Sequence, residues 1–193
     1  MAEVYQAKPR PTTQRSPGEP EDVVIKRLLP SYRNDAAWVK NFVDEAKLTV
    51  RLRHANIVRT FRCFKAGMDY LMVQELVSGR TLQYMPDAFR QANASMPASA
   101  GTYNGIGGAT IVHRDVNPTN ILLSVAGDVK LTDFGVAEVE GVMRGDSGAL
   151  RGTISYMAPE AVLGQAVDHR SDLFAAGVIL WELFTGQRLF AGN

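Results

Sequence analysis

The sequence is poor in the residues that build disulfides and structural zinc sites. Its 193 residues include one cysteine, Cys63, which cannot form an internal disulfide. Its three histidines, His54, His113 and His169, are scattered along the chain without the spacing of metal ligands. Both features predict a protein without a structural metal, in a reducing, cytoplasmic compartment.

The sequence also lacks a strong net charge and a long hydrophobic run. Lys plus Arg number 21 and Asp plus Glu number 20, which argues against a nucleic-acid-binding protein, because phosphate contacts need clustered basic residues. Residues 1–10 lack the apolar core of a signal peptide. The longest apolar run, residues 173–184, contains Glu182 and is too short to cross a bilayer. We therefore expect a buried core helix there and no membrane segment.

The composition that remains is that of an ordinary globular domain. Apolar residues make up 46% and charged residues 21%, which excludes wholesale disorder, a collagen-like repeat and a coiled coil. The charge is uneven, since residues 1–60 carry 11 basic and 7 acidic residues, whereas residues 111–193 carry 6 and 10. The plain interpretation is two solvated surfaces. The alternative is that carboxylates of the second half hold cations and lysines of the first half hold an anion.

The first part of the chain predicts a small sheet with one helix. A β-branched run at residues 23–26 predicts a buried strand that ends in a lysine. Apolar residues at three- and four-residue steps predict a helix over residues 36–53, with Asp35 as its N-cap. Residues 57–64 and 70–77 predict two further strands joined by a turn.

The second part begins at Ser78-Gly79, which breaks the pattern and marks a candidate hinge between two lobes. Residues 81–92 fit a short helix, whereas four glycines between residues 101 and 108 argue against a regular helix there. A strand pair is predicted within residues 121–131. Residues 171–185 predict a helix that is apolar nearly all round and therefore buried.

Several short motifs follow one another in a fixed order. They are His113-Arg114-Asp115, Asn120 after four further residues, Asp133-Phe134-Gly135 and Ala158-Pro159-Glu160, with Lys26 and Glu45 upstream. This set resembles the protein kinases of the serine/threonine type. The stretches HRDVNPTNILL and RGTISYMAPE resemble the bacterial eukaryote-like members.

The resemblance implies an α+β, two-lobed protein-kinase-like fold that is incomplete. A small, β-rich N-lobe is expected over residues 1–77 and a mainly helical C-lobe over residues 78–193. Against this fold the length is short, because it covers the small lobe and about half of the large one.

The resemblance also implies catalytic roles for five residues, which suit a reaction that needs positioned charges. Lys26 is expected to neutralise the α- and β-phosphates of ATP, with Glu45 holding it by a charge-assisted hydrogen bond. Asp115 is the expected catalytic base, and Asn120 and Asp133 are the expected Mg²⁺ ligands. Alone, a lysine at a strand end is usually a solvated surface residue.

The adenine site is implied by matching to the family. Backbone groups of a hinge segment that includes Glu75 and Val77 are expected to hydrogen-bond the base. Val4, Val24 and Leu122 are expected to sandwich the adenine ring. As isolated residues, these three are simply core positions of strands.

Further roles follow from the same matching. Gln74 falls at the position that limits access behind the adenine, and His113 is expected to pack under Phe134. Asp172 is expected to anchor the catalytic-loop backbone, although a helix N-cap is an equally good local interpretation. Thr153 resembles the threonine that hydrogen-bonds the catalytic aspartate in kinases specific for Ser and Thr.

The chain departs from the family pattern at four places. Residues 1–4 resemble only the tail of a Gly-rich phosphate loop, and Asn117 stands where the family has a lysine that contacts the transferred phosphate. The long helix expected before the catalytic loop is missing around residues 95–110, and this should expose an apolar face of the helix at 171–185. The chain then ends early, so Glu160 is expected to lack its usual arginine partner.

The sequence therefore predicts an enzyme that transfers the γ-phosphoryl group of ATP to Ser or Thr hydroxyls of a protein substrate, with Mg²⁺ as cofactor. One alternative is a truncated kinase-fold module that binds nucleotide or protein without efficient catalysis. The missing segments favour this module, and the intact catalytic residues disfavour it. Another alternative is an interaction fragment with exposed apolar surface.

Overall fold

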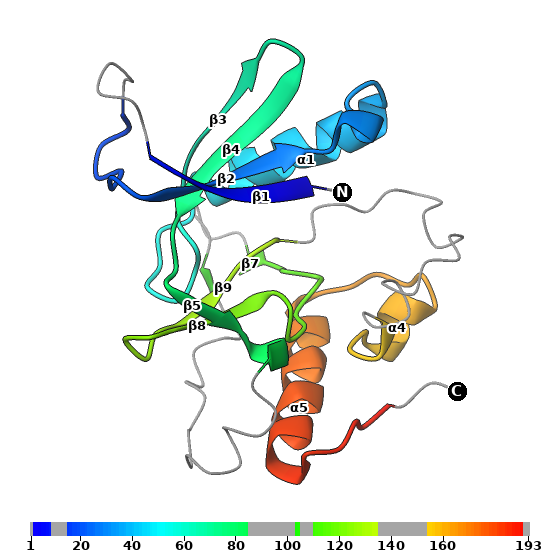
Figure 1. Cartoon of the computed structure of the whole chain (residues 1–193). Coiled ribbons are helices and arrows are strands. Elements are labelled where there is room, and N and C mark those ends of the chain that lie inside the picture. Colours follow the sequence, from blue (N-terminus) through cyan, green and yellow to red (C-terminus); the bar gives the residue numbers. More distant parts are fainter. Residues whose placement is uncertain (1, 9–14, 85–102, 105–109, 135–153, 191–193) are drawn as a thin grey trace. The chain divides into compact units, whose positions relative to one another are not determined.

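The computed structural model describes residues 2–8, 15–84, 103–104, 110–134 and 154–190 (Figure 1). These residues divide into two compact units. The first unit consists of the described residues up to Ser78, and the second of the described residues from Gly79 onward. Both units contain antiparallel strands and helices, as expected of the predicted α+β class.

The first unit is built on a four-stranded antiparallel sheet. Its strands lie in the order β1-β2-β4-β3, with bounds β1 (Ala2–Ala7), β2 (Val23–Leu28), β3 (Thr60–Ala66) and β4 (Asp69–Glu75). Strand β2 continues two residues beyond Lys26, which is therefore an internal residue and not the end of the strand. Lys26 lies directly opposite Val4 of β1 and Met72 of β4.

Helix α1 (Ala36–Thr49) follows a short 3-10 turn, η1 (Pro30–Tyr32). The Asp35 carboxylate caps α1 by accepting from Ala37 N at 2.9 Å, as the sequence predicts. The helix ends four residues before the predicted end, because tighter backbone bonds replace the α-helical ones after Thr49.

The two faces of the sheet are covered differently. Residues two apart along a strand share a face. On the face that carries Lys26, Leu28 and Met72 form a core with Phe42 and Ala46 of α1. The opposite face carries a smaller core of Val23, Phe61 and Val73. Strand β2 therefore carries apolar residues on both faces, with Lys26 among the α1-facing residues and Arg27, which pairs with Asp69, on the opposite face.

The second unit contains short strands. One sheet has the order β5-β8-β9, with bounds β5 (Gly79–Thr81), β8 (Ile121–Ser124) and β9 (Val129–Leu131). The predicted pair at 121–131 is confirmed, whereas β5 was not predicted. A Cβ atom on Gly79 would lie 1.8 Å from Leu123 O, so only glycine allows this approach of β5 to β8.

The remaining short elements lie near the glycine-rich segment. A helix was predicted over residues 81–92, of which the structure describes residues 81–84. Within these, residues Leu82–Tyr84 form a 3-10 turn, η2. Strands β6 (Tyr103–Asn104) and β7 (Thr110–Ile111) pair with each other. The rest of the segment at 95–110, where the family helix is expected to be missing, lies outside the described residues.

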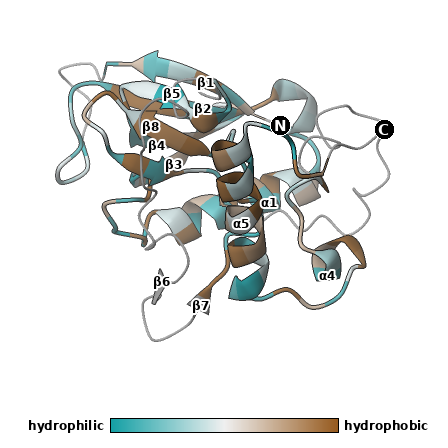
Figure 2. Cartoon of the chain, turned by 90° about the horizontal axis from the view of Figure 1, so that it is seen from below, coloured by the Kyte–Doolittle hydropathy of each residue, from teal (hydrophilic) through white to brown (hydrophobic). Residues whose placement is uncertain are grey.

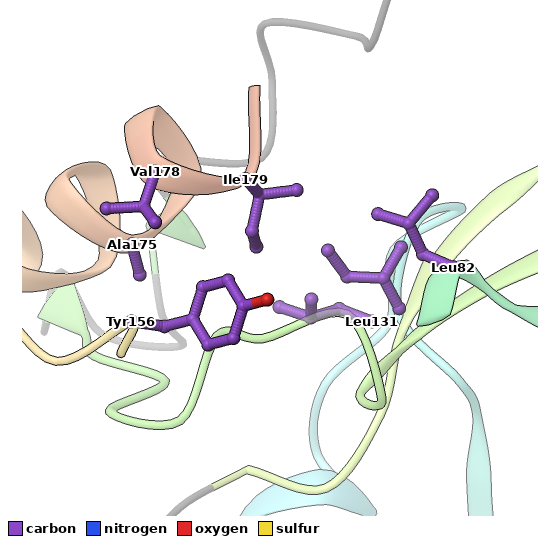
Figure 3. Close-up of a cluster of buried hydrophobic side chains, with 7 residues drawn as sticks. Leu82, Leu131, Tyr156, Ala175, Val178 and Ile179 are labelled. Atoms are coloured by element: carbon purple, nitrogen blue, oxygen red, sulfur yellow. The ribbon is translucent and has the colours of Figure 1, made fainter. Parts of the chain in front are cut away.

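Two helices follow, α4 (Pro159–Val162) and α5 (His169–Thr185). Asp168 caps the start of α5 by accepting from Arg170 N, and Gly186 ends it with a left-handed φ of 67°. One face of α5 packs on the strands in a core that Figure 3 shows from close by. The buried members of this core are Leu82, Ile121, Leu131, Tyr156, Ala175, Val178 and Ile179.

The prediction that α5 is buried all round is wrong. Figure 2 shows hydrophobic residues along much of the helix, yet Leu173, Trp181 and Phe184 are exposed by 48%, 37% and 81%. Among the described residues, the covered face of α5 carries Ala175, Val178 and Ile179, with Phe174 and Leu183 packed partly against the same core. The expected exposed apolar face is therefore present. Within the described part of the chain, no helix combines the length and the hydropathy needed to span a membrane.

Tyr156 makes the stability of this core depend on pH. Burial and the hydrogen bond that its hydroxyl donates to Glu182 Oε2 at 2.8 Å raise the pKa of Tyr156 to about 12. The unfolded chain has the ordinary tyrosine pKa of about 10. Stabilisation by the neutral phenol is therefore complete below about pH 10 and is lost as the pH rises towards 12.

Urea denaturation between pH 9 and 12 measures this effect. The free energy of unfolding of the wild-type chain should fall more steeply over this range than that of Tyr156→Phe, which has no ionisable hydroxyl. Parallel pH dependences in the two proteins would show that the Tyr156 phenol does not titrate differently on folding.

Candidate active site

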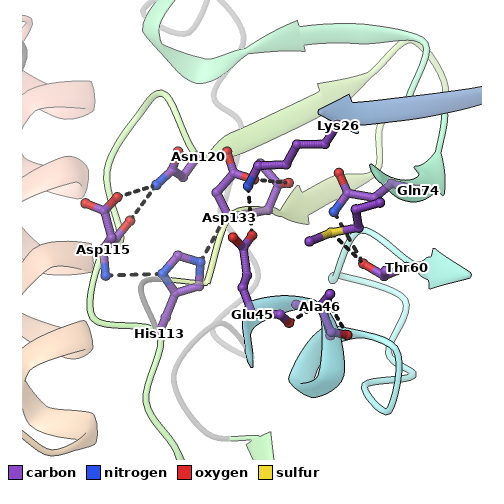
Figure 4. A network of polar contacts seen from close by, with 12 residues as sticks. Lys26, Glu45, Ala46, Thr60, Gln74, His113, Asp115, Asn120 and Asp133 are labelled. Atoms are coloured by element: carbon purple, nitrogen blue, oxygen red, sulfur yellow. Dashed lines mark hydrogen bonds and ion pairs between the residues drawn. The ribbon is translucent and has the colours of Figure 1, made fainter. Parts of the chain in front are cut away.

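The first unit contains a buried ion pair between Lys26 and Glu45. Lys26 Nζ lies 2.8 Å from Glu45 Oε1, and the two side chains are only 6% and 5% exposed (Figure 4). The pleat of β2 turns Lys26 towards α1, and the helical spacing of Phe42, Glu45 and Ala46 places the carboxylate on the buried side of α1. The structure thus brings together the two residues that the sequence pairs.

The residues predicted to bind adenine are divided between the units. In the first unit, Val4 is 64% exposed, and Val24 lies on the same face of the sheet as Lys26. The N–H of Glu75 donates to Arg59 O at 2.9 Å, so this amide is not available to a base. Val77 follows β4 and is half-buried. Leu122 lies in β8 of the second unit and is also half-buried.

Gln74, the residue expected to limit access behind the adenine, lies near the end of β4. Its side chain is buried, and its Nε2 donates to Thr60 Oγ1 at 3.3 Å. Thr60 is itself buried, so the pair satisfies two polar groups inside the sheet.

In the second unit, two asparagine amides hold the carboxylate of Asp115. Asn117 Nδ2 donates to Oδ1 and Asn120 Nδ2 donates to Oδ2, each at 2.9 Å (Figure 4). Burial raises the pKa of Asp115 above its ordinary value, and the two amide hydrogen bonds oppose this shift. Asp115 is thus a partly desolvated carboxylate with a defined orientation, as a positioned base requires.

The backbone before Asp115 is anchored by Asp172. Its two carboxylate oxygens accept from His113 N at 2.7 Å and from Arg114 N at 2.9 Å. Arg114 has a φ of 67°, a left-handed conformation that is uncommon for a residue other than glycine. Asp172 therefore makes the contacts expected of the loop anchor, whereas the N-cap of α5 is Asp168.

His113 supports the same loop with its ring. Asp115 N donates to His113 Nδ1 at 3.3 Å, so the proton lies on Nε2, which donates to Thr132 O at 3.0 Å. Burial lowers the pKa of His113 and keeps it neutral, as this pattern requires. The ring packs against Phe134 with centroids 4.5 Å apart, the contact that the sequence predicts.

The predicted magnesium ligands, Asn120 and Asp133, offer suitable oxygen atoms. Asn120 turns its Nδ2 to Asp115, so Oδ1, which lies 3.3 Å from the Thr119 hydroxyl, is the oxygen that its amide offers to a metal. Asp133 is half-buried and has a φ of 58°. The described residues contain no group of three or more His, Cys, Asp or Glu side chains arranged for a metal. Mg²⁺ at a nucleotide site is usually held by one or two carboxylates together with phosphates and water, so this donor set fits.

Three further residues that the sequence singled out are Glu160, Thr153 and Asn117. The Glu160 carboxylate accepts from Ser171 Oγ at 2.7 Å, a contact that does not test the prediction that its usual arginine partner is missing. Thr153 and Gly135 lie outside the described residues. The contact of Asn117 with Asp115 was missed, because the sequence shows Asn117 only as the place where a lysine is absent.

Comparison with known proteins decides the family. The model of the protein kinase domain matches residues 2–193. The chain belongs to the protein kinase family. It is 35% identical to the tyrosine-protein kinase MasK of Myxococcus xanthus, with 99% of this chain aligned, and 34% identical to the serine/threonine-protein kinase PknL of Mycobacterium tuberculosis, with 89% aligned. The chain spans only 32% and 44% of these two relatives.

A solved structure shows the same protein kinase fold. The crystal structure of the PknI kinase domain of Mycobacterium tuberculosis matches with a TM-score of 0.63 and 25% identity, over 99% of this chain and 71% of that one. The predicted family and fold class are thereby confirmed. The alignment with MasK is 212 positions long, whereas this protein kinase chain has 193 residues. Some residues of MasK are therefore aligned with gaps in this chain. Such gaps are expected if a segment common to the family is short here.

The buried pair of Lys26 and Glu45 yields a stability prediction. Lys26→Met leaves the Glu45 carboxylate buried without the lysine and should lower the free energy of unfolding by about 3–5 kcal/mol. Adding Glu45→Met should recover a large part of this loss, because it removes the carboxylate that Lys26→Met leaves buried without the lysine. Lys47→Met is the matched control, because Lys47 lies on α1, the helix of Glu45, and also pairs with a carboxylate, that of Asp44. The Lys47 side chain is 71% exposed, so its loss should cost about 0.5 kcal/mol or less.

Urea denaturation of the two single variants, the double variant and the control measures these differences. A double variant as unstable as the sum of its two single variants would show that the two charges do not interact.

The Asp172 anchor yields a second prediction. Asp172→Asn replaces one acceptor oxygen with an NH₂ group that faces a backbone N–H, and should cost about 1–3 kcal/mol. Hydrogen exchange at His113 N or Arg114 N should become faster. Asp168→Asn, at the exposed cap of the same helix, keeps a capping oxygen and should change the free energy of unfolding by only a few tenths of a kcal/mol. Equal effects of the two variants would argue against a special role of Asp172.

Proposed function

We propose that this chain is the catalytic part of a kinase that transfers the γ-phosphoryl group of Mg-ATP to Ser or Thr hydroxyls of a protein substrate. The observation that carries the proposal is the Asp115 carboxylate, which is held by two amides and lies in a loop whose backbone Asp172 anchors. Membership of the protein kinase family supports the reaction class.

Asp115 is the proposed base. Each of its oxygens accepts one amide hydrogen bond and keeps a second lone pair for the proton of the substrate hydroxyl. Phosphoryl transfer passes through a loose transition state, so holding and orienting this hydroxyl is the main task of the carboxylate. The rigid loop serves this task because an error of about 1 Å in position can cost about 100-fold in rate.

The remaining site residues bind the nucleotide in this proposal. Lys26, positioned by Glu45, binds the α- and β-phosphates, and Asn120 and Asp133 provide oxygen ligands for Mg²⁺. Mg-ATP supplies the phosphoryl group, and the cation neutralises its charge. The adenine-binding residues are Val4, Val24, Glu75, Val77 and Leu122.

The choice of Ser or Thr as acceptor rests on the relatives and on one residue. PknL and PknA of Mycobacterium tuberculosis are named serine/threonine-protein kinases, and MasK is named a tyrosine-protein kinase. Thr153 follows the pattern of the Ser/Thr-specific kinases and favours the first class. A reducing, cytoplasmic setting is proposed from the single cysteine, Cys63.

A second candidate function is a kinase-fold binding module with little or no catalysis. The observation that favours it is the apolar surface of α5, where Leu173, Trp181 and Phe184 are exposed. Exposed apolar groups on one helix are typical of surfaces that bind other proteins. The complete set of proposed catalytic residues favours the enzyme.

Transfer of ³²P from ATP to a basic protein tests the first proposal. Asp115→Asn should lower kcat by at least about 100-fold, the usual contribution of a general base, without weakening Mg-ATP binding. Asp133→Ala should lower both transfer and Mg-ATP binding. Asp128→Asn, at the exposed β8–β9 turn, is the matched control and should retain full activity.

Two results would contradict the proposal. Transfer that survives both Asp115→Asn and Asp133→Ala would overturn the assignment of the catalytic residues. A wild-type chain that is stabilised by Mg-ATP in a thermal-shift titration but transfers no phosphate would favour the binding module. The absence of any thermal shift at millimolar Mg-ATP would count against nucleotide binding altogether.

A further inference from the structure

Asn117 stands where the family pattern has a lysine, and its contacts differ from those of a residue that binds phosphate. The side chain is almost fully buried, with 3% of the residue exposed. Its Nδ2 donates to Asp115 Oδ1 at 2.9 Å and to Asp115 O at 3.2 Å. Its Oδ1 accepts from Thr119 N at 2.9 Å and also from the Thr119 hydroxyl.

These contacts use the whole hydrogen-bonding capacity of the Asn117 amide. An asparagine side chain has two N–H donors and one oxygen with two lone pairs. Both donors go to Asp115, and the oxygen accepts from Thr119 N and from the Thr119 hydroxyl, which also lies 3.3 Å from Asn120 Oδ1. No donor is left for a phosphate oxygen, and burial separates the amide from solvent.

The contact of Asn117 with Asp115 adds a second restraint to a carboxylate that Asn120 holds at one oxygen. Asn120 Nδ2 donates to Asp115 Oδ2 and to Asp115 O, both at 2.9 Å. Without Asn117, one amide hydrogen bond, the one to Oδ2, would resist rotation of the carboxylate about its Cβ–Cγ bond. The second amide, from Asn117, holds Oδ1 and so defines the plane of the carboxylate.

We propose that Asn117 is a positioning residue for Asp115, which sets the orientation of the carboxylate without contacting the transferred phosphate. This inference rests on the proposed kinase function. In this chain a neutral amide, braced by Thr119, orients the base where the family pattern has a charged side chain. Asn117 acts through Asp115 and is not itself a catalytic residue.

Asn117→Ser is the variant that tests the proposal. Serine is neutral and keeps a side-chain oxygen for Thr119 N, as short polar residues do in such turns, but it loses the NH₂ group. The kcat for transfer to a protein substrate should fall about 100-fold, the cost of a misplaced catalytic group, while KM for ATP and the Kd of Mg-ATP stay within about twofold. Asn34→Ser, at an exposed turn of the first unit, is the matched control with unchanged kinetics.

A second measurement does not depend on activity. In ¹⁵N-edited NMR spectra, the side-chain amide protons of Asn120 should exchange faster with solvent in Asn117→Ser than in the wild-type chain and the Asn34→Ser control. This is expected because the Asp115 carboxylate that Asn120 binds becomes mobile. A thermal melt of each variant verifies that the fold is retained.

The outcomes separate this inference from the proposed function. An unchanged kcat in Asn117→Ser, or a raised KM and Kd for Mg-ATP at constant kcat, would overturn the positioning role, the latter in favour of a phosphate contact. Unchanged exchange at Asn120 would overturn it as well. A wild-type chain without transfer would overturn the proposed function, and the exchange measurement would still report whether Asn117 holds Asp115.

Discussion

The geometry of the second unit depends on the contact between one carboxylate and two adjacent backbone amides. Asp172 on α5 accepts from His113 N and Arg114 N, and this contact stabilises a left-handed φ at Arg114 that a free chain would rarely adopt. With the backbone turned in this way, Asp115 presents its N–H to the ring of His113 and its carboxylate to the two asparagines. The apolar packing of α5 therefore positions a polar loop, because the anchor lies on the same helix as the core residues.

In the first unit, a buried ion pair positions a charged side chain in a similar way. Lys26 lies on the α1-facing side of β2, where its neighbours Leu28 and Met72 are apolar. A charged amine there is tolerated only with a partner, which α1 provides in Glu45 at 2.8 Å. Breaking this pair leaves a buried charge, so the position of α1 against the sheet and the position of the lysine are coupled.

Much of this could be predicted from the sequence, because local signals identify caps, strands and the family motifs. Examples of correct predictions are the Asp35 cap of α1, the turn between β8 and β9, and the pairing of Lys26 with Glu45. The extent of burial of α5 could not be predicted, since an all-apolar helix does not reveal which of its faces packs on the strands. Strand β5 has only three residues and depends on the close approach of Gly79 to Leu123, a tertiary contact without a local pattern.

Asn117 shows why a departure from a motif is hard to interpret without coordinates. As a sequence difference, it removes one positive charge near Asp115 and suggests a weaker site. In the structure, its amide is satisfied by Asp115 on one side and Thr119 on the other, so the change replaces charge with fixed geometry. In the proposed reaction, Mg²⁺ and Lys26 would then neutralise the charge of the transferred phosphate. The contribution of Asn117 in place of that charge is the fixed orientation of the Asp115 carboxylate.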